Sequence, residues 1–95
     1  MLEENIMRCV ITVVGKDTVG ILAMVSGICK ECNVNVVEVT QSILQDMFCM
    51  MMMADTTNAN VDFETFADKL NSYGTEHGLS IHAMHEDIFN SMHRI

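Results

Sequence analysis

The chain has 95 residues, of which 49% are hydrophobic, and its formal net charge is −8. This length suits one domain, residues 1–95, with a single hydrophobic core. The negative charge argues against a nucleic-acid or anionic-membrane partner, because both require clustered lysine and arginine side chains.

The first predicted element is a strand over residues 6–14, where β-branched and apolar residues run up to Gly15. Side chains alternate between the two faces of a strand. One face is therefore wholly apolar and is expected to lie in the core: Met7, Cys9, Ile11 and Val13. The opposite face is mixed: Ile6, Arg8, Val10, Thr12 and Val14.

A helix is predicted after this strand, with Asp17 or Thr18 as its N-cap. Apolar residues then recur at helical spacing and define the buried stripe: Ile21, Leu22, Val25, Ile28, Cys29 and Cys32. Asn33 follows the stripe and belongs to a residue type that tolerates a left-handed helix cap. The helix is therefore expected to end there.

Residues 34–43 and 47–54 are predicted to form a hairpin, joined by a short connection at residues 44–46. The first of these strands alternates, so we expect one face to carry Val37, Val39 and Ile43. Its other face then carries Glu38, Thr40 and Ser42. The second strand, MFCMMMMA, is apolar on both faces, and we expect both to be covered.

A second helix is predicted to start at Asp62 as N-cap and to end where Gly74 and Gly78 bracket it. Its buried stripe is formed by apolar residues: Phe63, Phe66, Ala67, Leu70 and Tyr73. A last strand follows over residues 79–86, with Leu79, Ile81 and Ala83 opposite Ser80, His82 and Met84. The tail at residues 87–95 is expected to form one or two helical turns, anchored by Ile88, Phe89 and Met92.

The resulting order of elements is βαββαβ, which is typical of the ferredoxin-like split sandwich. We therefore predict an α+β fold: a four-stranded antiparallel sheet with two helices on one face, plus a short C-terminal helix. The other face of the sheet would be apolar. It would carry one side of the methionine-rich strand and six further residues: Ile6, Val10, Val14, Val34, Val36 and Met84. Because soluble monomers seldom expose such a face, either the C-terminal helix or a second copy should cover it. We favour a two-fold homodimer.

Gly15 and Gly20 have the spacing of a phosphate-binding P-loop, but Ile21 and Leu22 stand where that motif needs lysine and a hydroxyl residue. A phosphate site is therefore excluded. The start of the helix still offers unpaired amides, which attract a carboxylate. The alternative is that Asp17 caps those amides and the glycines only shape the turn.

No catalytic, metal or cofactor site is predicted. The pair Cys29 and Cys32 lies on an apolar stripe, so we interpret these residues as buried structural thiols. His82 and His85 fall on opposite faces of a strand and cannot share a metal ion. The N-terminus, MLEEN, is acidic where a secretory signal would be basic, and no apolar run approaches the roughly 18 residues of a membrane span. We expect a soluble cytoplasmic protein without a membrane partner.

The motif VGKDTVGIL, followed by NVNVVEV, resembles the ACT domain, a small ferredoxin-like regulatory module. The sequence is especially similar to the free-standing ACT proteins of the UPF0237 group and to the ACT domains of glycine-cleavage repressors. This resemblance implies that two copies pair and that an amino acid or another small molecule binds between them. The turn of one copy and the start of the second strand of its partner would then form the site.

Carried onto this sequence, the resemblance implies one set of ligand-binding residues: Gly15, Asp17, Val19, Gly20, Ile21, Leu22, Asn33, Asn35 and Val36. Val19 stands where the family usually has proline, which leaves the turn less rigid. The first hypothesis is therefore an amino-acid-binding regulatory module that acts as a homodimer on a separate protein. The second is a dimerisation or protein-interaction module without a small-molecule ligand. Neither hypothesis makes the protein an enzyme.

Overall fold

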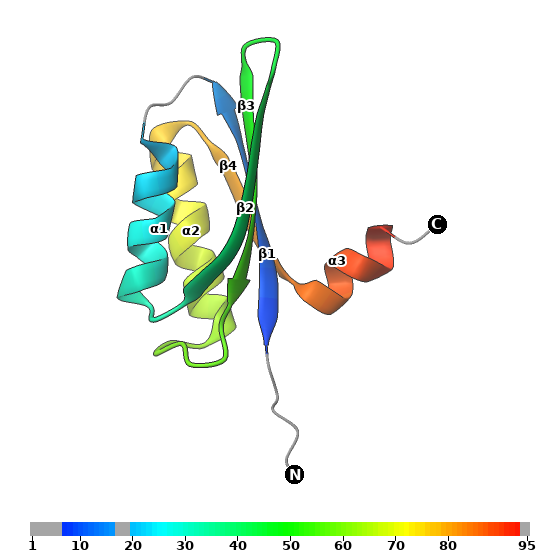
Figure 1. The fold of residues 1–95 in the computed structure, drawn as a ribbon. Coiled ribbons are helices and arrows are strands. Elements are labelled where there is room, and N and C mark those ends of the chain that lie inside the picture. The colour runs from blue at the N-terminus through cyan, green and yellow to red at the C-terminus, as the bar shows by residue number, and fades with distance from the viewer. Residues whose placement is uncertain (1–6, 17–19, 94–95) are drawn as a thin grey trace.

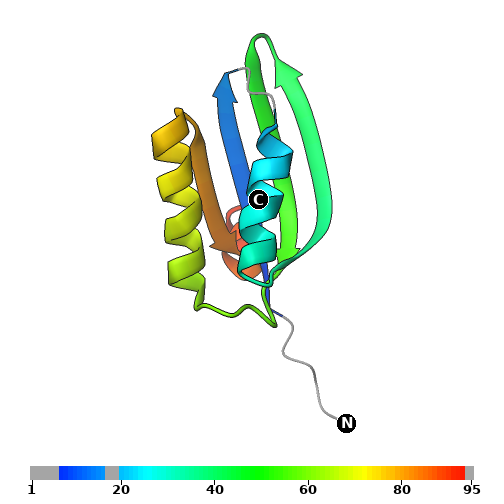
Figure 2. The same ribbon diagram turned by 90° about the vertical axis from the view of Figure 1, so that its left-hand side faces the viewer.

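The computed structural model describes residues 7–16 and 20–93 of the chain (Figure 1). Its elements, in chain order, are β1 (Arg8–Lys16), α1 (Ile21–Glu31), β2 (Asn35–Leu44), β3 (Met47–Asp55), α2 (Phe63–His77), β4 (Ser80–His85) and α3 (Glu86–His93). The strands form one sheet in the order β2-β3-β1-β4, and each pair of neighbours is antiparallel. α1 and α2 cover one face, while α3 leaves the sheet on the other side (Figures 1 and 2). The predicted ferredoxin-like fold is confirmed.

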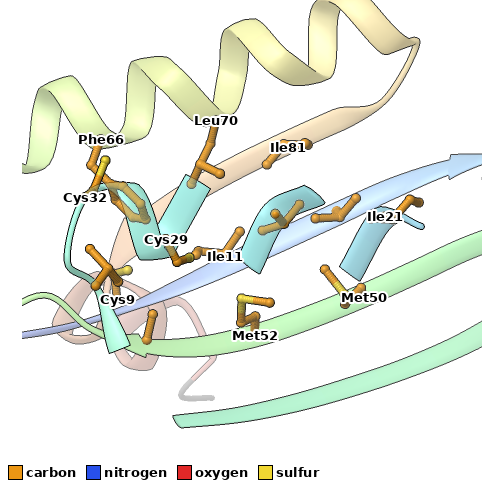
Figure 3. Packing of buried hydrophobic residues seen from close by; sticks show 14 of the residues in the cluster. Cys9, Ile11, Ile21, Cys29, Cys32, Met50, Met52, Phe66, Leu70 and Ile81 are labelled. Carbon is orange, nitrogen blue, oxygen red and sulfur yellow. The ribbon is translucent and has the colours of Figure 1, made fainter. Parts of the chain in front are cut away.

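The hydrophobic core lies between the sheet and the two covering helices. Alternation along β1 directs Cys9, Ile11 and Val13 to that side, and all three are 0% exposed. They pack with apolar side chains from α1, α2, β3 and β4 (Figure 3). Met7 precedes the strand and is 46% exposed, so its predicted place in the core is wrong.

The β2 strand contains a bulge that reverses part of the predicted pattern. Val36 pairs with Ala54 and Glu38 with Met53, so Val37 is an extra, unpaired residue. Val36 and Val39 therefore lie on the helix-facing side of β2. The prediction that Val37 shares a face with Val39 is wrong. Val36 and the buried Val34 pack in or against the core, so the prediction that they face outward is also wrong.

The end of α1 and the start of α2 agree with the sequence. Asn33 has the expected left-handed conformation, with φ 57°, and Asp62 caps α2 by accepting a hydrogen bond from the Thr65 amide at 3.0 Å. The start of α1 is a correction. Gly20 occupies its N-cap with φ 81°, which places the first helical residue at Ile21. Asp17 and Thr18, the predicted caps, lie outside the described residues.

The end of α2 also differs from the prediction. The helix continues through Gly74 to His77, and Gly78 alone forms its left-handed cap, with φ 72°. Gly74 is instead a buried contact point, where the helix carbonyl accepts a hydrogen bond from the Leu79 amide at 2.8 Å. Of the helices in the described part of the chain, none is long and apolar enough to cross a membrane.

The second face of the sheet is covered at one end only. Val10 is 2% exposed, and α3 contacts β1 and β4. An ion pair between Arg8 and Glu86 fixes the start of α3, with two nitrogen–oxygen distances of 3.1 and 3.0 Å. Ile88 is 51% exposed and therefore does not anchor α3 as predicted. We expect both faces of β3 to be covered. Within one chain, only the face of β3 toward α1 and α2 is fully covered.

Candidate functional site

The predicted ligand-binding residues fall into two groups at opposite ends of α1. Gly20, Ile21 and Leu22 stand at its first turn, whereas Asn33 and Asn35 follow its last turn. With 11 residues and about 1.5 Å of rise per residue, α1 separates the groups by roughly 16 Å. One chain therefore does not bring the two groups together. Two further predicted residues lie outside the described part of the chain: Asp17 and Val19.

At the turn, only part of the predicted set is accessible. Gly15 is buried, and a Cβ atom at this position would clash with the side chain of Leu79, so this glycine serves packing. Ile21 is 3% exposed and belongs to the core. Leu22 is 37% exposed, and a Cβ atom at Gly20 would meet nothing within 4 Å. The turn can thus present the backbone at Gly20 and the side chain of Leu22.

The second group lines a groove of about 490 Å³. This groove lies where the second half of α1, the start of β2 and the end of β3 meet. It combines one charge of each sign with amide, hydroxyl and apolar groups: Ser26, Lys30, Asn33, Val34, Asn35, Val36, Asp55 and Asn58. Three predicted residues are therefore brought together here: Asn33, Asn35 and Val36.

Hydrogen bonds between distant segments hold the walls of the groove. The Asn33 side-chain amide donates to the Asn58 carbonyl at 2.8 Å. Asn60 donates its side-chain amide to the Glu31 carbonyl at 3.0 Å and its backbone amide to the Cys32 carbonyl at 2.9 Å. The loop after β3 is thus fastened to the end of α1, which preorganises the groove.

The two charged residues of the groove are both available for a ligand. Hydrogen bonds from Thr57, one of them from its backbone amide at 2.9 Å, hold the pKa of Asp55 below its usual range, and the nearby Arg8 charge adds to this effect. Asp55 is therefore a carboxylate at neutral pH. Lys30 forms no ion pair with any described residue, unlike Arg8, Lys16 and Lys69. The groove is thus lined by one basic and one acidic residue.

Five members of this groove are not among the predicted ligand-binding residues: Ser26, Lys30, Val34, Asp55 and Asn58. Lys30 lies off the apolar stripe of α1, and the pattern identifies it only as solvent-facing. Asp55 ends β3 and comes beside Asn35 because β2 and β3 pair in that register. No local spacing indicates that these residues meet.

The cysteines and histidines have the environments that the pattern predicts. Cys29 and Cys32 are free, buried thiols, and so is Cys9. Burial raises the pKa of Cys9 to about 12 and that of Cys29 to about 11, with a neighbouring thiol adding to each shift. His85 faces the helices and stacks on Phe63 with a centroid distance of 4.2 Å; the register places His82 on the opposite face. Within residues 7–16 and 20–93, no three metal-binding side chains gather.

These thiols predict how stability depends on pH. An unfolded cysteine ionises near pH 9.0, whereas the folded Cys9 and Cys29 stay protonated to about pH 12 and 11. Their contribution to the free energy of unfolding is thus complete below pH 9 and is lost as the pH rises toward 11–12. Denaturant titrations between pH 8 and 11 should show this decline, and Cys29→Ala should make it shallower. A thiol reagent at pH 8 that quickly modifies Cys9 or Cys29 in the native protein would contradict this assignment.

The sheet and its two covering helices define a ferredoxin-like domain, and a polar groove lies at the end of α1. The family model described as ACT domain matches residues 8–84. The chain belongs to the ACT domain family, in its UPF0237 group. A UPF0237 protein of Clostridium perfringens is 46% identical over 89 residues, which cover 94% of this chain and 100% of that protein.

Two solved structures place the fold among known proteins. An ACT domain protein from Streptococcus pneumoniae superposes with a TM-score of 0.78 and 33% identity, covering 90% of this chain and 96% of that one. A candidate glycine cleavage system transcriptional repressor superposes with a TM-score of 0.69 and 21% identity, covering 86% of this chain and 47% of that one. At that identity, the second likeness concerns the fold alone.

Proposed function

We propose that this protein is a regulatory module that binds an amino acid, works as a homodimer and acts on a separate protein rather than as an enzyme. ACT domains are in general regulatory modules for small molecules. The observation that carries the proposal is the groove between α1 and β2, which Lys30 and Asp55 both line. We place the protein in the cytoplasm, because its free cysteines suit a reducing compartment.

The chemistry of the groove matches a zwitterion. The ammonium of Lys30 is a partner for the ligand carboxylate, and the carboxylate of Asp55 is a partner for the ligand ammonium. Asn35 and Asn58 add amide groups that fix the orientation, while Val36 supplies apolar surface. A volume of about 490 Å³ lies within the range of small-molecule sites, roughly 300–1,000 Å³.

A second copy completes this site. The turn at Gly20 and Leu22 stands at the opposite end of α1 from Asn35. An antiparallel two-fold pair reverses the ends of one copy relative to the other. The turn of one protomer can then close the groove of its partner, which is the arrangement that the family resemblance implies.

Calorimetric titration against the common amino acids tests the binding site. We expect one of them to bind, and both Lys30→Met and Asp55→Asn to weaken it about tenfold or more, because each removes a charge-assisted contact. Lys69→Met is the matched control, since Lys69 lies on α2 and pairs with Glu31 at 3.6 Å. Its affinity should equal that of the wild type.

Two further variants test the contribution of the turn. Gly20→Leu places a side chain where the partner or ligand approaches, and Asn35→Ala removes the amide of the facing β2. Because Gly20 is left-handed, Gly20→Asn serves as a control for backbone strain. Unchanged affinity in both Gly20→Leu and Asn35→Ala would exclude the turn from the site. A dimer that binds no amino acid would favour the alternative function, a dimerisation or protein-interaction module.

A further inference from the structure

A second groove, of about 430 Å³, surrounds the start of β4, between the end of α2 and the end of β1. Both views place the α2–β4 connection and the end of β1 at the same end of the molecule (Figures 1 and 2). Met47 begins β3 and lines this β4 groove, whereas Asp55 ends β3 and lines the groove beside α1. The nine residues of β3 rise about 3.4 Å each, which puts these two residues roughly 27 Å apart. The two grooves are therefore separate.

The charge of the β4 groove differs from that of the chain as a whole. The sequence has 13 aspartates and glutamates against 5 lysines and arginines. Among the described residues that line the β4 groove, however, Lys16 is present and no carboxylate is. Other pockets in the described part of the chain each include at least one acidic residue: Asp55 beside α1, Asp68 and Glu76 on α2, and Glu86 and Asp87 on α3. The β4 groove is thus a place where this acidic protein can accept an anion.

Strand register places the polar side chains of the β4 groove on one face of the sheet. Val14 of β1 pairs with Ser80 of β4. Lys16 lies two residues further along β1, so its side chain shares the face of Val14 and Ser80. Diagonal neighbours of this kind have Cα atoms about 7–8 Å apart, which a long side chain can span. An oxyanion above Ser80 is therefore within reach of the Lys16 ammonium.

His82 orients the hydroxyl group of Ser80. It lies two residues further along β4 on the same face, and its Nε2 atom is 3.2 Å from Ser80 Oγ. In the tautomer that carries a proton on Nε2, His82 donates to Ser80. The hydroxyl proton of Ser80 is then free to donate to an anion. The pair therefore adds a hydrogen bond donor to the charge of Lys16.

Apolar surface adjoins this polar row. Val14 and Met47 are each 37% exposed, and Met47 is the register partner of Lys16 on β3. Beneath them, Leu79 is 8% exposed and packs against Gly15, where a Cβ atom would clash with the leucine side chain. The floor of the groove is therefore closed and apolar. A ligand that combines one anionic group with an apolar chain matches both parts of this surface.

We propose that the β4 groove binds a small organic monoanion, a carboxylate on a short apolar chain. Lys16 and Ser80 hold the carboxylate, and Val14 and Met47 contact the chain. One lysine charge matches one negative charge, whereas a dianion such as phosphate would leave a charge unpaired on a chain of net charge −8. This site lies outside the amino-acid groove and does not rest on the function proposed above.

Asp46 is the group that the ligand replaces. Its carboxylate is 3.7 Å from the Lys16 ammonium, and the two side chains are 78% and 72% exposed. Ion pairs between such exposed side chains contribute little to stability. A carboxylate that also receives the Ser80 hydrogen bond and covers apolar surface therefore competes with Asp46 for Lys16.

Hexanoate is the probe that tests the site, titrated into the isotope-labelled full chain and followed by nuclear magnetic resonance. We expect chemical-shift changes at the amides of Val14, Lys16, Ser80 and His82. Hexanamide has the same size and no charge, so it should cause much smaller changes at the same concentration. Equal changes with hexanamide, no change with hexanoate, or changes centred on Lys30 in the groove beside α1 would overturn the proposal.

Two variants with opposite expected effects test the role of Lys16. Lys16→Met removes the charge and keeps the length, and should weaken hexanoate binding by about threefold or more. Asp46→Asn frees Lys16 and should strengthen binding. Glu64→Gln is the matched control, because it removes one negative charge at the first turn of α2, roughly 16 Å along the helix from Thr75 in the groove. Unchanged affinity in Lys16→Met, or equal effects of Asp46→Asn and Glu64→Gln, would exclude Lys16 from the site.

Discussion

Replacing Phe66 by alanine is expected to lower the free energy of unfolding by about 3–5 kcal/mol, the usual loss for a fully buried phenylalanine. Phe66 is 0% exposed and heads the fully buried side chains by volume. It extends from α2 into the layer between helices and sheet (Figure 3). Alanine removes its apolar area from the core and leaves a cavity that the surrounding strands cannot fill. Small domains have a total free energy of unfolding of about 5–15 kcal/mol, so this single substitution removes a large fraction of it.

Two variants show whether this loss comes from the cavity. Phe66→Leu keeps most of the volume, and we expect it to cost less than about 1.5 kcal/mol. Phe48→Ala removes the same ring at a half-buried position and should cost less than Phe66→Ala. Urea titration of all three measures the differences. Equal losses for Phe66→Ala and Phe48→Ala would contradict the burial argument.

Replacing Gly74 by alanine is expected to destabilise the protein by about 1–3 kcal/mol, even though alanine normally favours a helix. A Cβ atom at Gly74 would lie 2.7 Å from the Leu79 carbonyl oxygen and 3.0 Å from Ile81 Cγ1. The Leu79 amide also donates to the Gly74 carbonyl at 2.8 Å, so the two segments cannot separate without losing that bond. The helix and β4 must therefore shift or strain.

Gly27 supplies the matched control within the same protein. It lies inside α1, is exposed, and a Cβ atom there would meet nothing within 4 Å. Gly27→Ala should therefore stabilise the protein by about 0.5–1 kcal/mol, because it restricts the unfolded chain and favours the helix. Thermal unfolding of both variants should give shifts of opposite sign. A stabilising Gly74→Ala would refute the close approach of α2 to β4.

Most of the fold follows from patterns that the sequence displays locally. The alternation of Cys9, Ile11 and Val13 identifies the buried face of β1, and the spacing of Val25 and Cys29 identifies that of α1. The side-chain chemistry of Asp62 alone predicts that it caps α2, and the structure confirms this cap. In each case the information lies within one element. Apolar residues that recur every 2 residues in a strand, or every 3.6 residues in a helix, indicate which side is buried.

The bulge at Val37 shows where such patterns fail. A strand of valines has apolar residues at both parities, so its sequence is compatible with either face. The pairing of β2 with β3 decides which valines face the helices, because Val36 and Glu38 pair with two consecutive residues of β3. At the start of α1, Asp17 and Thr18 have the right chemistry for a cap, but the left-handed Gly20 delays the helix.

The sequence by itself therefore determined the order of the elements, the core face of β1 and the family of the protein. Only the tertiary structure decided that Lys30 and Asp55 line one groove with Asn35 and that α3 leaves half of the open face uncovered. The physical reason is that periodicity is a property of one element, set by its own backbone geometry. A groove or an exposed face depends on strand register and on the packing of helices, which contacts between distant segments determine.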